Sequence, residues 1–291
     1  MNRFYERLSK ITFGWLGERY ASSFESLKPY LKGGRISVLL KTWINMTFLT
    51  SFIAFFVSLA AVLIAGMFLE IFFLYYLLML VFVPVLASAF TFMGFYLYPM
   101  QRAKSRASSI EKNLPFAITH MAATASSGIP PEFMFSLIGG FKEYGEISEE
   151  ANMVVRDIRT FGSSSVAAMK NVASQTPSKD LKEVLLGISS TIETGGNLTS
   201  LLQQMSEKAL FEYRIKREKY LKTLSTYADI YTALLVAAPL FLLSTLATMS
   251  IIGGDIMGFS TSQIVTLMTW VALPSMNIAF LAFIHMTYPG V

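Results

Sequence analysis

Four long apolar segments alternate with polar stretches along this chain of 291 residues. They cover approximately residues 43–67, 71–98, 227–252 and 264–286. Each is long enough to cross the hydrocarbon core of a bilayer, which takes about 20 apolar residues in a helix. The pattern therefore predicts four transmembrane helices.

The long polar region between the second and third apolar segments has a helical period. Apolar residues recur there every three or four positions, and no run of alternating β-branched residues appears. One stripe begins at Leu114 and another at Leu181. The sequence therefore predicts an all-α fold, in which a polytopic membrane protein carries a helical domain between its second and third transmembrane helices.

The two stripes align with each other at a constant offset, which indicates an internal repeat. Each copy has a helix, a break marked by glycine, and a second helix. Glycine is favoured at helix ends because it adopts the left-handed conformation without steric cost. The domain is thus expected to contain two pseudo-repeated helical hairpins. The aligned pairs are Leu114 with Leu181, Thr124 with Thr191, Gly128 with Gly195, and Met134-Phe135 with Leu201-Leu202.

The second copy continues into the third apolar segment without an interruption. Helical spacing begins at Leu198, and nothing before Pro239 would break the helix. At about 1.5 Å per residue, the part below the membrane would be about 40 Å long. This predicts a stiff helix joining the domain to the bilayer. Its basic cluster precedes the span at the depth of lipid headgroups, and consists of Arg214, Lys216, Arg217, Lys219 and Lys222.

Composition and charge agree with membrane insertion and give an orientation. Hydrophobic residues make up 53% and charged residues 15%, whereas charged residues are about a quarter of a soluble domain. All 24 Lys and Arg lie within residues 3–41 and 102–222. Because positive charge is retained on the cytoplasmic side, both termini and the domain are predicted to be cytoplasmic. The expected divisions are an N-terminal segment (1–41), transmembrane helices 1 and 2 (42–98), the cytoplasmic domain (99–226) and transmembrane helices 3 and 4 (227–291).

The N-terminal segment has the pattern of an amphipathic helix. Its apolar residues follow helical spacing and basic residues surround them. Two interpretations stay open: the helix lies on the membrane or on a partner, or it packs against the cytoplasmic domain of the same chain. The apolar positions are Phe4, Leu8, Ile11 and Trp15, and the basic ones Arg3, Arg7, Lys10 and Arg19.

The residue inventory predicts no catalytic, metal or cofactor site. The chain has no cysteine and two histidines, which excludes thiolate metal sites and cysteine nucleophiles. No Gly-rich loop followed by Lys and Ser or Thr occurs, so the chain does not look like an NTPase. The acidic residues of the apolar segments, Glu70, Asp229 and Asp255, fall near their ends, which disfavours a transporter.

An acidic stretch in the middle of the domain has two interpretations. The first is a solvated helix face, and the second is an acidic surface that docks a basic partner. The candidate residues are Glu143, Glu146, Glu149, Glu150 and Asp157.

The order of these features resembles a known family. Two spans, a helical domain with "EKNLPFAITHMAATASSGIP" and "ETGGNLTSLLQQMSEKA", a basic "YRIKREKY" and two further spans are similar to the type II secretion F domain of inner-membrane platform proteins. The resemblance covers about Glu111 to Pro289, and this chain has one such unit where bacterial pilus platforms duplicate it. That favours the tight-adherence type or an archaeal flagellar relative. The motif positions are Leu114, Pro115, Gly128, Gly195, Gly196 and Leu198.

The resemblance implies a non-enzymatic platform for a pilus-like filament. Its expected partners are a cytoplasmic hexameric secretion ATPase, pilin subunits, membrane lipids, and a second copy or a paralogue, but no nucleic acid. The acidic stretch is the candidate ATPase contact, and Gly195 and Gly196 are the candidate joint that moves the long helix. Two other functions stay open, a small membrane transporter and a membrane-anchored scaffold for another cytoplasmic complex.

Overall fold

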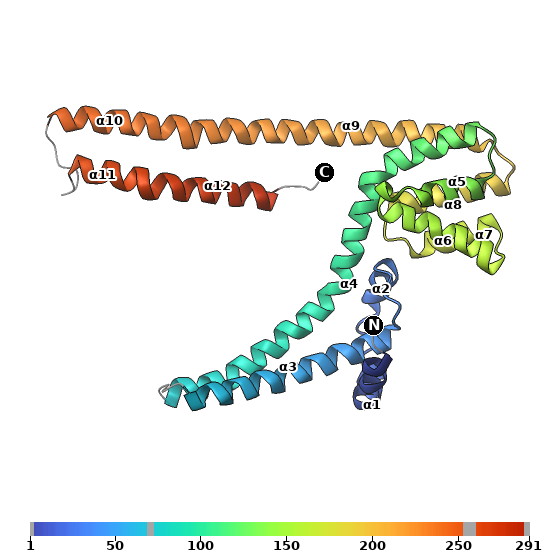
Figure 1. Cartoon of the computed structure of the whole chain (residues 1–291), viewed down its shortest axis with the longest axis horizontal. Helices are drawn as coiled ribbons and strands as arrows, with labels where there is room; N and C mark the ends of the chain where they lie inside the picture. Colours follow the sequence, from blue (N-terminus) through green and yellow to red (C-terminus); the bar gives the residue numbers. More distant parts are fainter. Residues whose placement is uncertain (1–2, 69–72, 253–259, 288–291) are drawn as a thin grey trace. The chain divides into compact units, whose positions relative to one another are not determined.

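The computed structural model describes residues 3–68, 73–252 and 260–287, and every regular element in these ranges is helical. The chain forms two compact units, residues 1–209 and 210–291. Figure 1 shows the course of the helices. Four helical stretches are long and apolar enough to cross a membrane, which confirms the predicted number of spans. Glu70 and Asp255 lie outside the described residues.

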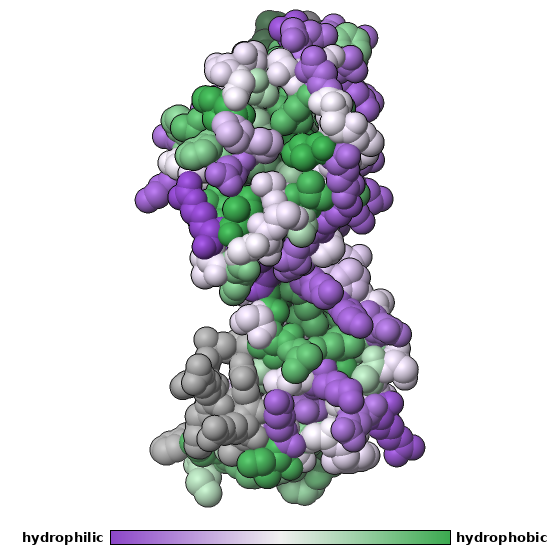
Figure 2. All heavy atoms as spheres, turned by 90° about the vertical axis from the view of Figure 1, so that its right-hand side faces the viewer, coloured by the Kyte–Doolittle hydropathy of each residue, from purple (hydrophilic) through white to green (hydrophobic). Residues whose placement is uncertain are grey.

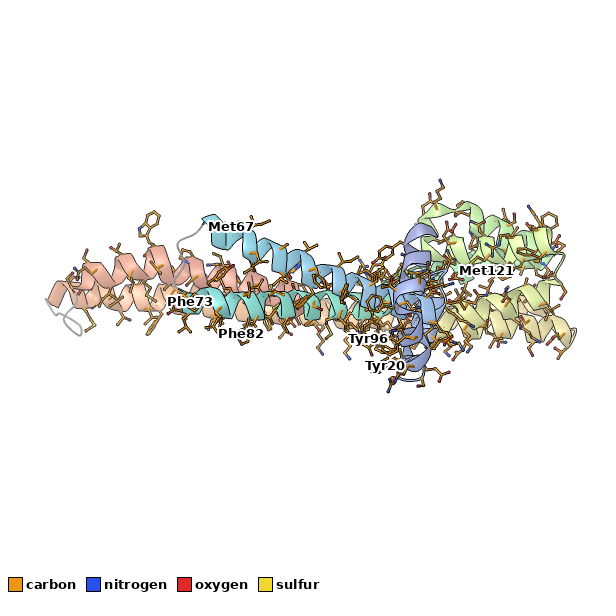
Figure 3. All side chains as sticks on the ribbon, turned by 90° about the horizontal axis from the view of Figure 1, so that it is seen from below. Tyr20, Met67, Phe73, Phe82, Tyr96 and Met121 are labelled. Carbon is orange, nitrogen blue, oxygen red and sulfur yellow. The ribbon has the colours of Figure 1, made fainter. Side chains whose placement is uncertain are left out.

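In the first unit, two long helices form an antiparallel hairpin. They are α3 (Leu40–Phe68) and α4 (Phe73–Ser126). Figure 3 shows Met67 and Phe73 at one end of this hairpin and Tyr96 near the other. Aromatic rings join the two helices near Tyr96: Trp43 stacks on Tyr98 with 6.1 Å between ring centroids, and Phe48 packs on Phe92 at 5.7 Å.

The first three turns of α3 are covered by protein rather than lipid. Helix α1 (Arg3–Arg19) packs across them, so that Phe13 meets Phe52 at 5.7 Å between centroids. Gly17 allows this approach, because a Cβ there would collide with the Asn45 side chain. The first apolar helix long enough to span a membrane covers Leu40–Met67, close to the predicted start at Trp43, and the exposed large apolar side chains of α3 begin at Phe52. Buried polar residues beneath α1 and its neighbours are Thr42, Asn45, Thr47 and Ser51.

Only part of the apolar surface of α1 packs against the rest of the first unit. The helix packs against α3, whereas one of its two predicted contact surfaces was the cytoplasmic domain. Ile11 is 85% exposed and Trp15 is 61% exposed. The apolar face that contains them is thus directed away from the rest of the first unit. The chain then continues through η1 (Glu25–Leu27) and α2 (Lys28–Gly33) into α3.

Helix α4 is one helix of 54 residues that serves two environments. Its first part pairs with α3, and its last part contributes Ile110, Leu114, Ile118 and Met121 to the core of the helical domain. Pro84, Pro99 and Pro115 lie inside it. Figure 1 shows that α4 changes direction along its course, as expected of a helix with internal prolines.

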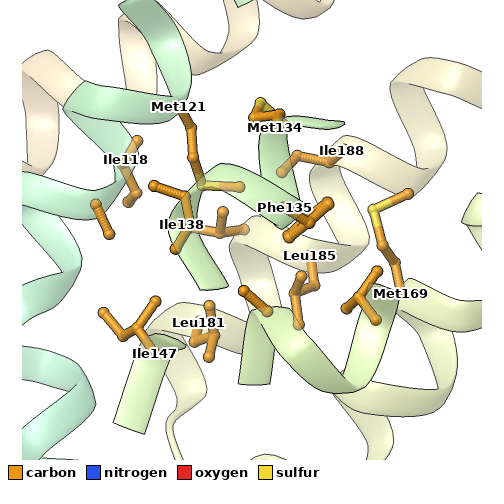
Figure 4. Packing of buried hydrophobic residues seen from close by; sticks show 14 of the residues in the cluster. Ile118, Met121, Met134, Phe135, Ile138, Ile147, Met169, Leu181, Leu185 and Ile188 are labelled. Carbon is orange, nitrogen blue, oxygen red and sulfur yellow. The ribbon is translucent and has the colours of Figure 1, made fainter. Parts of the chain in front are cut away.

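The helical domain packs short helices against the end of α4. They are α5 (Pro131–Gly140), η2 (Lys142–Tyr144), α6 (Glu146–Phe161), α7 (Ser165–Gln175), α8 (Lys179–Glu193) and the beginning of α9 (Leu198–Tyr231). Figure 4 shows Met121, Phe135, Ile138, Leu185 and Ile188 meeting in the core. Each is at most 4% exposed. Figure 2 shows polar side chains over much of the outer face, with apolar patches between them.

Two glycine turns close the helical hairpins where the sequence placed breaks. Gly128 has φ +72° and Gly195 has φ +67°, a conformation that costs little only for glycine. The aligned threonines make equivalent bonds, since Thr124 Oγ1 donates to the carbonyl of His120 and Thr191 Oγ1 to that of Gly187. Both turns lie at the glycines where the sequence predicted breaks between helices.

The second unit contains the last two apolar helices. Residues from Leu210 of α9 continue through η3 (Thr232–Ala237) into α10 (Ala238–Ile252), and α11 (Thr261–Leu267), η4 (Met268–Ala272) and α12 (Leu273–Thr287) follow. The predicted helix is continuous, but η3 and η4 have the wider π geometry. Pro239 and Pro274 each come two residues after a π segment. A wider turn accommodates a ring that would clash with a carbonyl of the preceding turn.

The two helices of this unit touch through tyrosines of α9. Tyr231 donates its hydroxyl to Asn277 Oδ1 at 3.1 Å, and its ring lies 5.3 Å from that of Phe280. Tyr227 packs on Phe283 at 5.7 Å. Hydrogen bonds of this kind between apolar helices satisfy polar groups that would otherwise face hydrocarbon.

Candidate functional site

A buried arginine stands where α4 passes from the membrane hairpin to the helical domain. Arg106 is 6% exposed, which is unusual for arginine unless its charge is paired. Its Nε donates to Glu146 Oε2 at 2.8 Å, and its Nη2 donates to Glu150 Oε1 at 2.7 Å. Its Nη1 donates to the carbonyl oxygen of Gly33. One guanidinium thus joins α4, α6 and the end of α2.

A second arginine approaches the same carboxylates from the N-terminal side. Arg35 follows α2, and its Nη1 donates to Glu149 Oε2 at 3.4 Å. Its Nη2 lies 3.5 Å from Glu150 Oε1. Arg35 has φ +50°, a conformation that non-glycine residues rarely adopt. We call Arg35, Arg106, Glu146, Glu149 and Glu150 the arginine node.

The carboxylate of Glu150 is the most buried acidic group of the arginine node. Glu150 is 3% exposed. Burial raises the pKa of Glu150, and the charges of Arg35 and Arg106 oppose that rise. Glu150 Oε2 and two buried nitrogens of Arg35, Nε and Nη2, make no hydrogen bond within the described residues. In a buried ion pair, the attraction between the charges offsets the cost of burying them only when the two groups are well aligned. Removing one partner leaves the other charge buried and uncompensated.

The acidic stretch is not the solvated face that the sequence suggested. Glu146 and Glu150 point into the arginine node. Asp157 is 5% exposed and its Oδ2 accepts from Asn171 Nδ2 at 2.6 Å. These three positions share the face of α6 that packs on the domain, so the idea of an exposed acidic surface is wrong for them. Glu143 is exposed, and so is Glu149, whose side chain is 63% accessible.

The motif residues occupy structural positions, whereas the basic cluster is exposed. Leu114 and Pro115 are buried in α4, and Leu198 packs against the domain core at the start of α9. Gly128 and Gly195 form the two turns described above. A Cβ on Gly196 would lie 3.1 Å from Thr191 Cγ2, tighter than usual. All members of the basic cluster are exposed, namely Arg214, Lys216, Arg217, Lys219 and Lys222.

Sequence reasoning did not find the arginine node. Arg106 looks like any other basic residue after a span, and Arg35 like any residue of the N-terminal segment. The only local signal is the spacing of Glu146 and Glu150, which puts both carboxylates on one side of a helix. Among the described residues, no three His, Cys, Asp or Glu side chains are grouped to hold a metal.

These features define a helical membrane protein in which one domain is tied to its membrane helices by a continuous helix and a buried ion-pair network. Residues 117–245 match the family described as type II secretion system (T2SS), protein F. This match over part of the chain agrees with the resemblance that the sequence predicted. Arg35 and Arg106 precede the matched region, so the arginine node links the family domain to the part of the chain before it.

One relative extends the comparison beyond the family domain. An uncharacterized protein of Methanocaldococcus jannaschii is 24% identical over 196 residues. That alignment covers 66% of this chain but 33% of the relative, so the chain spans about a third of the length of the protein it matches. No solved structure matches the chain.

Proposed function

We propose that this chain is the cytoplasmic-membrane platform for assembly of a type IV pilus-like filament. In this role it couples a cytoplasmic hexameric secretion ATPase to the insertion of pilin subunits, without being an enzyme itself. The observation that carries the proposal is α4, in which one helix of 54 residues supplies both a span and part of the core of a T2SSF domain. Displacement of the domain would therefore reach the bilayer without crossing a loop.

The arginine node supplies the transmission step. A force that the ATPase exerts on α6 would displace Glu146 and Glu150. Their carboxylate oxygens accept from Arg106 Nε and Nη2 at 2.8 and 2.7 Å. Arg106 is part of α4, so the force passes to the helix that spans the membrane. Short, charge-assisted bonds with fixed geometry resist separation better than single neutral hydrogen bonds. The same arginine holds Gly33, so the N-terminal segment moves with the domain.

The helical hairpins supply the moving part. The turn of the first hairpin lies at Gly128 and that of the second at Gly195. Both hairpins contribute to one core. We infer that they are pseudo-repeated units, that a second copy or a paralogue supplies the matching surface of an oligomer, and that Gly195 and Gly196 let the hairpin of α8 and α9 move. The equivalent threonine bonds support the repeat.

We propose that the ATPase contacts only the most exposed carboxylates of the acidic stretch. Glu143 and Glu149 are exposed, and we assign them to this contact in place of the whole acidic stretch. Charge reversal at Glu143 is the better test, because Glu149 also pairs with Arg35. Glu183 on α8 is exposed as well and provides a matched control, Glu183→Lys against Glu143→Lys.

The direct experiment is a crosslinking pull-down from native membranes with this chain as bait, followed by mass spectrometry. The proposal expects a secretion ATPase and a prepilin among the crosslinked proteins. Glu143→Lys is expected to lower ATPase recovery at least threefold, with Glu183→Lys unchanged. Recovery of a different cytoplasmic complex, with neither ATPase nor prepilin, would contradict the platform function and favour the scaffold.

A further inference from the structure

A lysine-rich pocket lies between the N-terminal helices and the beginning of α3. It has a volume of about 560 Å³. Its basic lining comes from three elements, since Lys10 belongs to α1, Lys28 and Lys32 to α2, and Lys41 to the first turn of α3. The remaining lining residues are mainly aliphatic and include Leu31, Ile36, Val38, Leu39 and Leu40.

Among the described residues, acidic side chains pair with only part of the charge of this pocket. Glu25 is the acidic residue of the lining. Lys41 has Glu18 4.0 Å away, at the limit of an ion pair. Among the described residues, Lys10, Lys28 and Lys32 form no salt bridge, and all three are exposed. Several ammonium groups held around one hollow create a positive potential that attracts an anion.

The pocket adjoins the polar end of a helix that is long and apolar enough to cross a membrane, because Lys41 belongs to the first turn of α3. Exposed large apolar side chains of α3 begin at Phe52, and those of the part of α4 that pairs with α3 extend to Tyr98. Trp43 and Tyr98 stack at the end of that band nearest Lys41, as aromatic residues do at a membrane interface. Lys41 is two residues before Trp43, and long lysine side chains reach toward headgroups from such positions.

We propose that this pocket binds the headgroup of an anionic phospholipid. The lysines would contact the phosphate, and the aliphatic lining would contact the glycerol and the first carbons of the acyl chains. Lysine is suited to this role because its ammonium is a point charge on a flexible stem that adjusts to differently placed phosphates.

The bound lipid would tie the N-terminal helices to the membrane surface. Basic pockets between membrane helices on the cytoplasmic side suit anionic headgroups. Helix α1 touches α3, α2 touches α4, and Gly33 of α2 accepts from Arg106, so lipid occupancy would stabilise the arginine node. This site is independent of the platform function, because neither an ATPase nor a pilin takes part in it.

Lipid binding to the purified full-length chain in a neutral detergent tests the proposal. Retained lipids are counted by native mass spectrometry during titration with phosphatidylglycerol or phosphatidylcholine. Phosphatidylglycerol is expected to bind at least tenfold more tightly than phosphatidylcholine. The double variant Lys28→Gln with Lys32→Gln should weaken its binding about tenfold. The matched control, Lys179→Gln with Lys182→Gln on the exposed face of α8, should stay within twofold of the parent.

Three results would overturn the proposal. Equal binding of the two lipids would show that the headgroup charge is not recognised. An equal loss in the α8 control would show that net charge, rather than the pocket, attracts the lipid. Displacement of the lipid by millimolar inorganic phosphate, with phosphate itself binding more weakly to the Lys28 and Lys32 variant, would assign the pocket to a soluble phosphate instead.

Discussion

Arg106 shows how one residue determines the connection between a domain and its membrane helices. It donates to two carboxylates of α6 and to a backbone carbonyl of the N-terminal segment. No other residue of α4 in the described structure bonds to both of these elements. A lysine could not reproduce this arrangement, because only the planar guanidinium presents donors in several fixed directions.

Removal of that guanidinium should destabilise the protein strongly. We expect Arg106→Met to lower the free energy of unfolding by about 3–5 kcal/mol, since Glu150 then stays buried without its partner. The double variant Arg106→Met with Glu150→Met should recover part of this loss. Thermal unfolding in detergent is the measurement. Arg156→Met is the control and should cost much less, because Arg156 is 57% exposed and its partner Asp157 still accepts from Asn171. Equal effects of Arg106→Met and Arg156→Met would contradict the role of the node.

Substitutions at Gly195 should lower the stability of the protein to different extents. At φ +67°, Gly195→Ala should cost about 1–2 kcal/mol because an L-residue is strained there. Gly195→Asn should cost less, since asparagine enters this region more readily. Nothing lies within 4 Å of the added Cβ, so conformation alone decides the result.

The Gly195 variants also test the joint. If Gly195 and Gly196 allow the hairpin to move, Gly195→Ala with Gly196→Ala should slow filament assembly more than the loss of stability explains. Gly128→Ala is the control, because Gly128 has the same conformation at φ +72° without belonging to the second hairpin. Assembly at the normal rate by the double variant, measured in cells, would exclude the joint.

At the scale of elements, continuity of helices distinguishes this structure from a domain on a flexible tether. The sequence predicted a helix running from Leu198 into the third span, and the helix continues through η3 into α10. The sequence analysis made no prediction about the corresponding continuity of α4, which contains Pro99 and Pro115. A proline inside a helix removes one hydrogen bond and bends the helix without ending it when packing holds both sides.

The exposed face of α1 predicts the depth of that helix. If α1 lies in the membrane interface, Ile11 and Trp15 should be within the headgroup region. The chain has no cysteine, so Ile11→Cys and Trp15→Cys carry a spin label at a single site. In vesicles, both labels should be more accessible to oxygen than to a water-soluble nickel complex, while Lys182→Cys on α8 should show the reverse. Preferential access of the nickel complex at both α1 sites would place this face in water or on a soluble partner.

At the scale of the whole molecule, the distribution of charge predicts the topology. Both termini and the helical domain should be cytoplasmic, and the link between α10 and α11 should face the other side. In intact cells or right-side-out vesicles, a membrane-impermeant maleimide should label Ser262→Cys and leave Lys182→Cys unlabelled until the membrane is permeabilised. Both sites are exposed in the structure. The opposite pattern would reverse the assigned orientation.

The sequence by itself determined what depends on patterns along the chain. Apolar runs longer than a bilayer core predicted four spans, and the helical period predicted an all-α domain. The glycines at positions 128 and 195 predicted breaks between helices, and both form turns. These properties are local, because hydrophobicity, periodicity and backbone freedom can be read from a few neighbouring residues. The basic cluster within residues 214–222 is also a local pattern, and its lysines and arginines are exposed.

Only the tertiary structure decided which polar groups meet. Glu150 comes 44 residues after Arg106 in the chain, and Gly33 comes 73 residues before it. The spacing of Glu146 and Glu150 places both on one side of a helix, but it does not show that Glu150 is buried while Glu149 is exposed. The lysine-rich pocket likewise requires α1, α2 and α3 to come together. Burial and pairing of charges depend on contacts between distant segments, and these arise only when the helices pack.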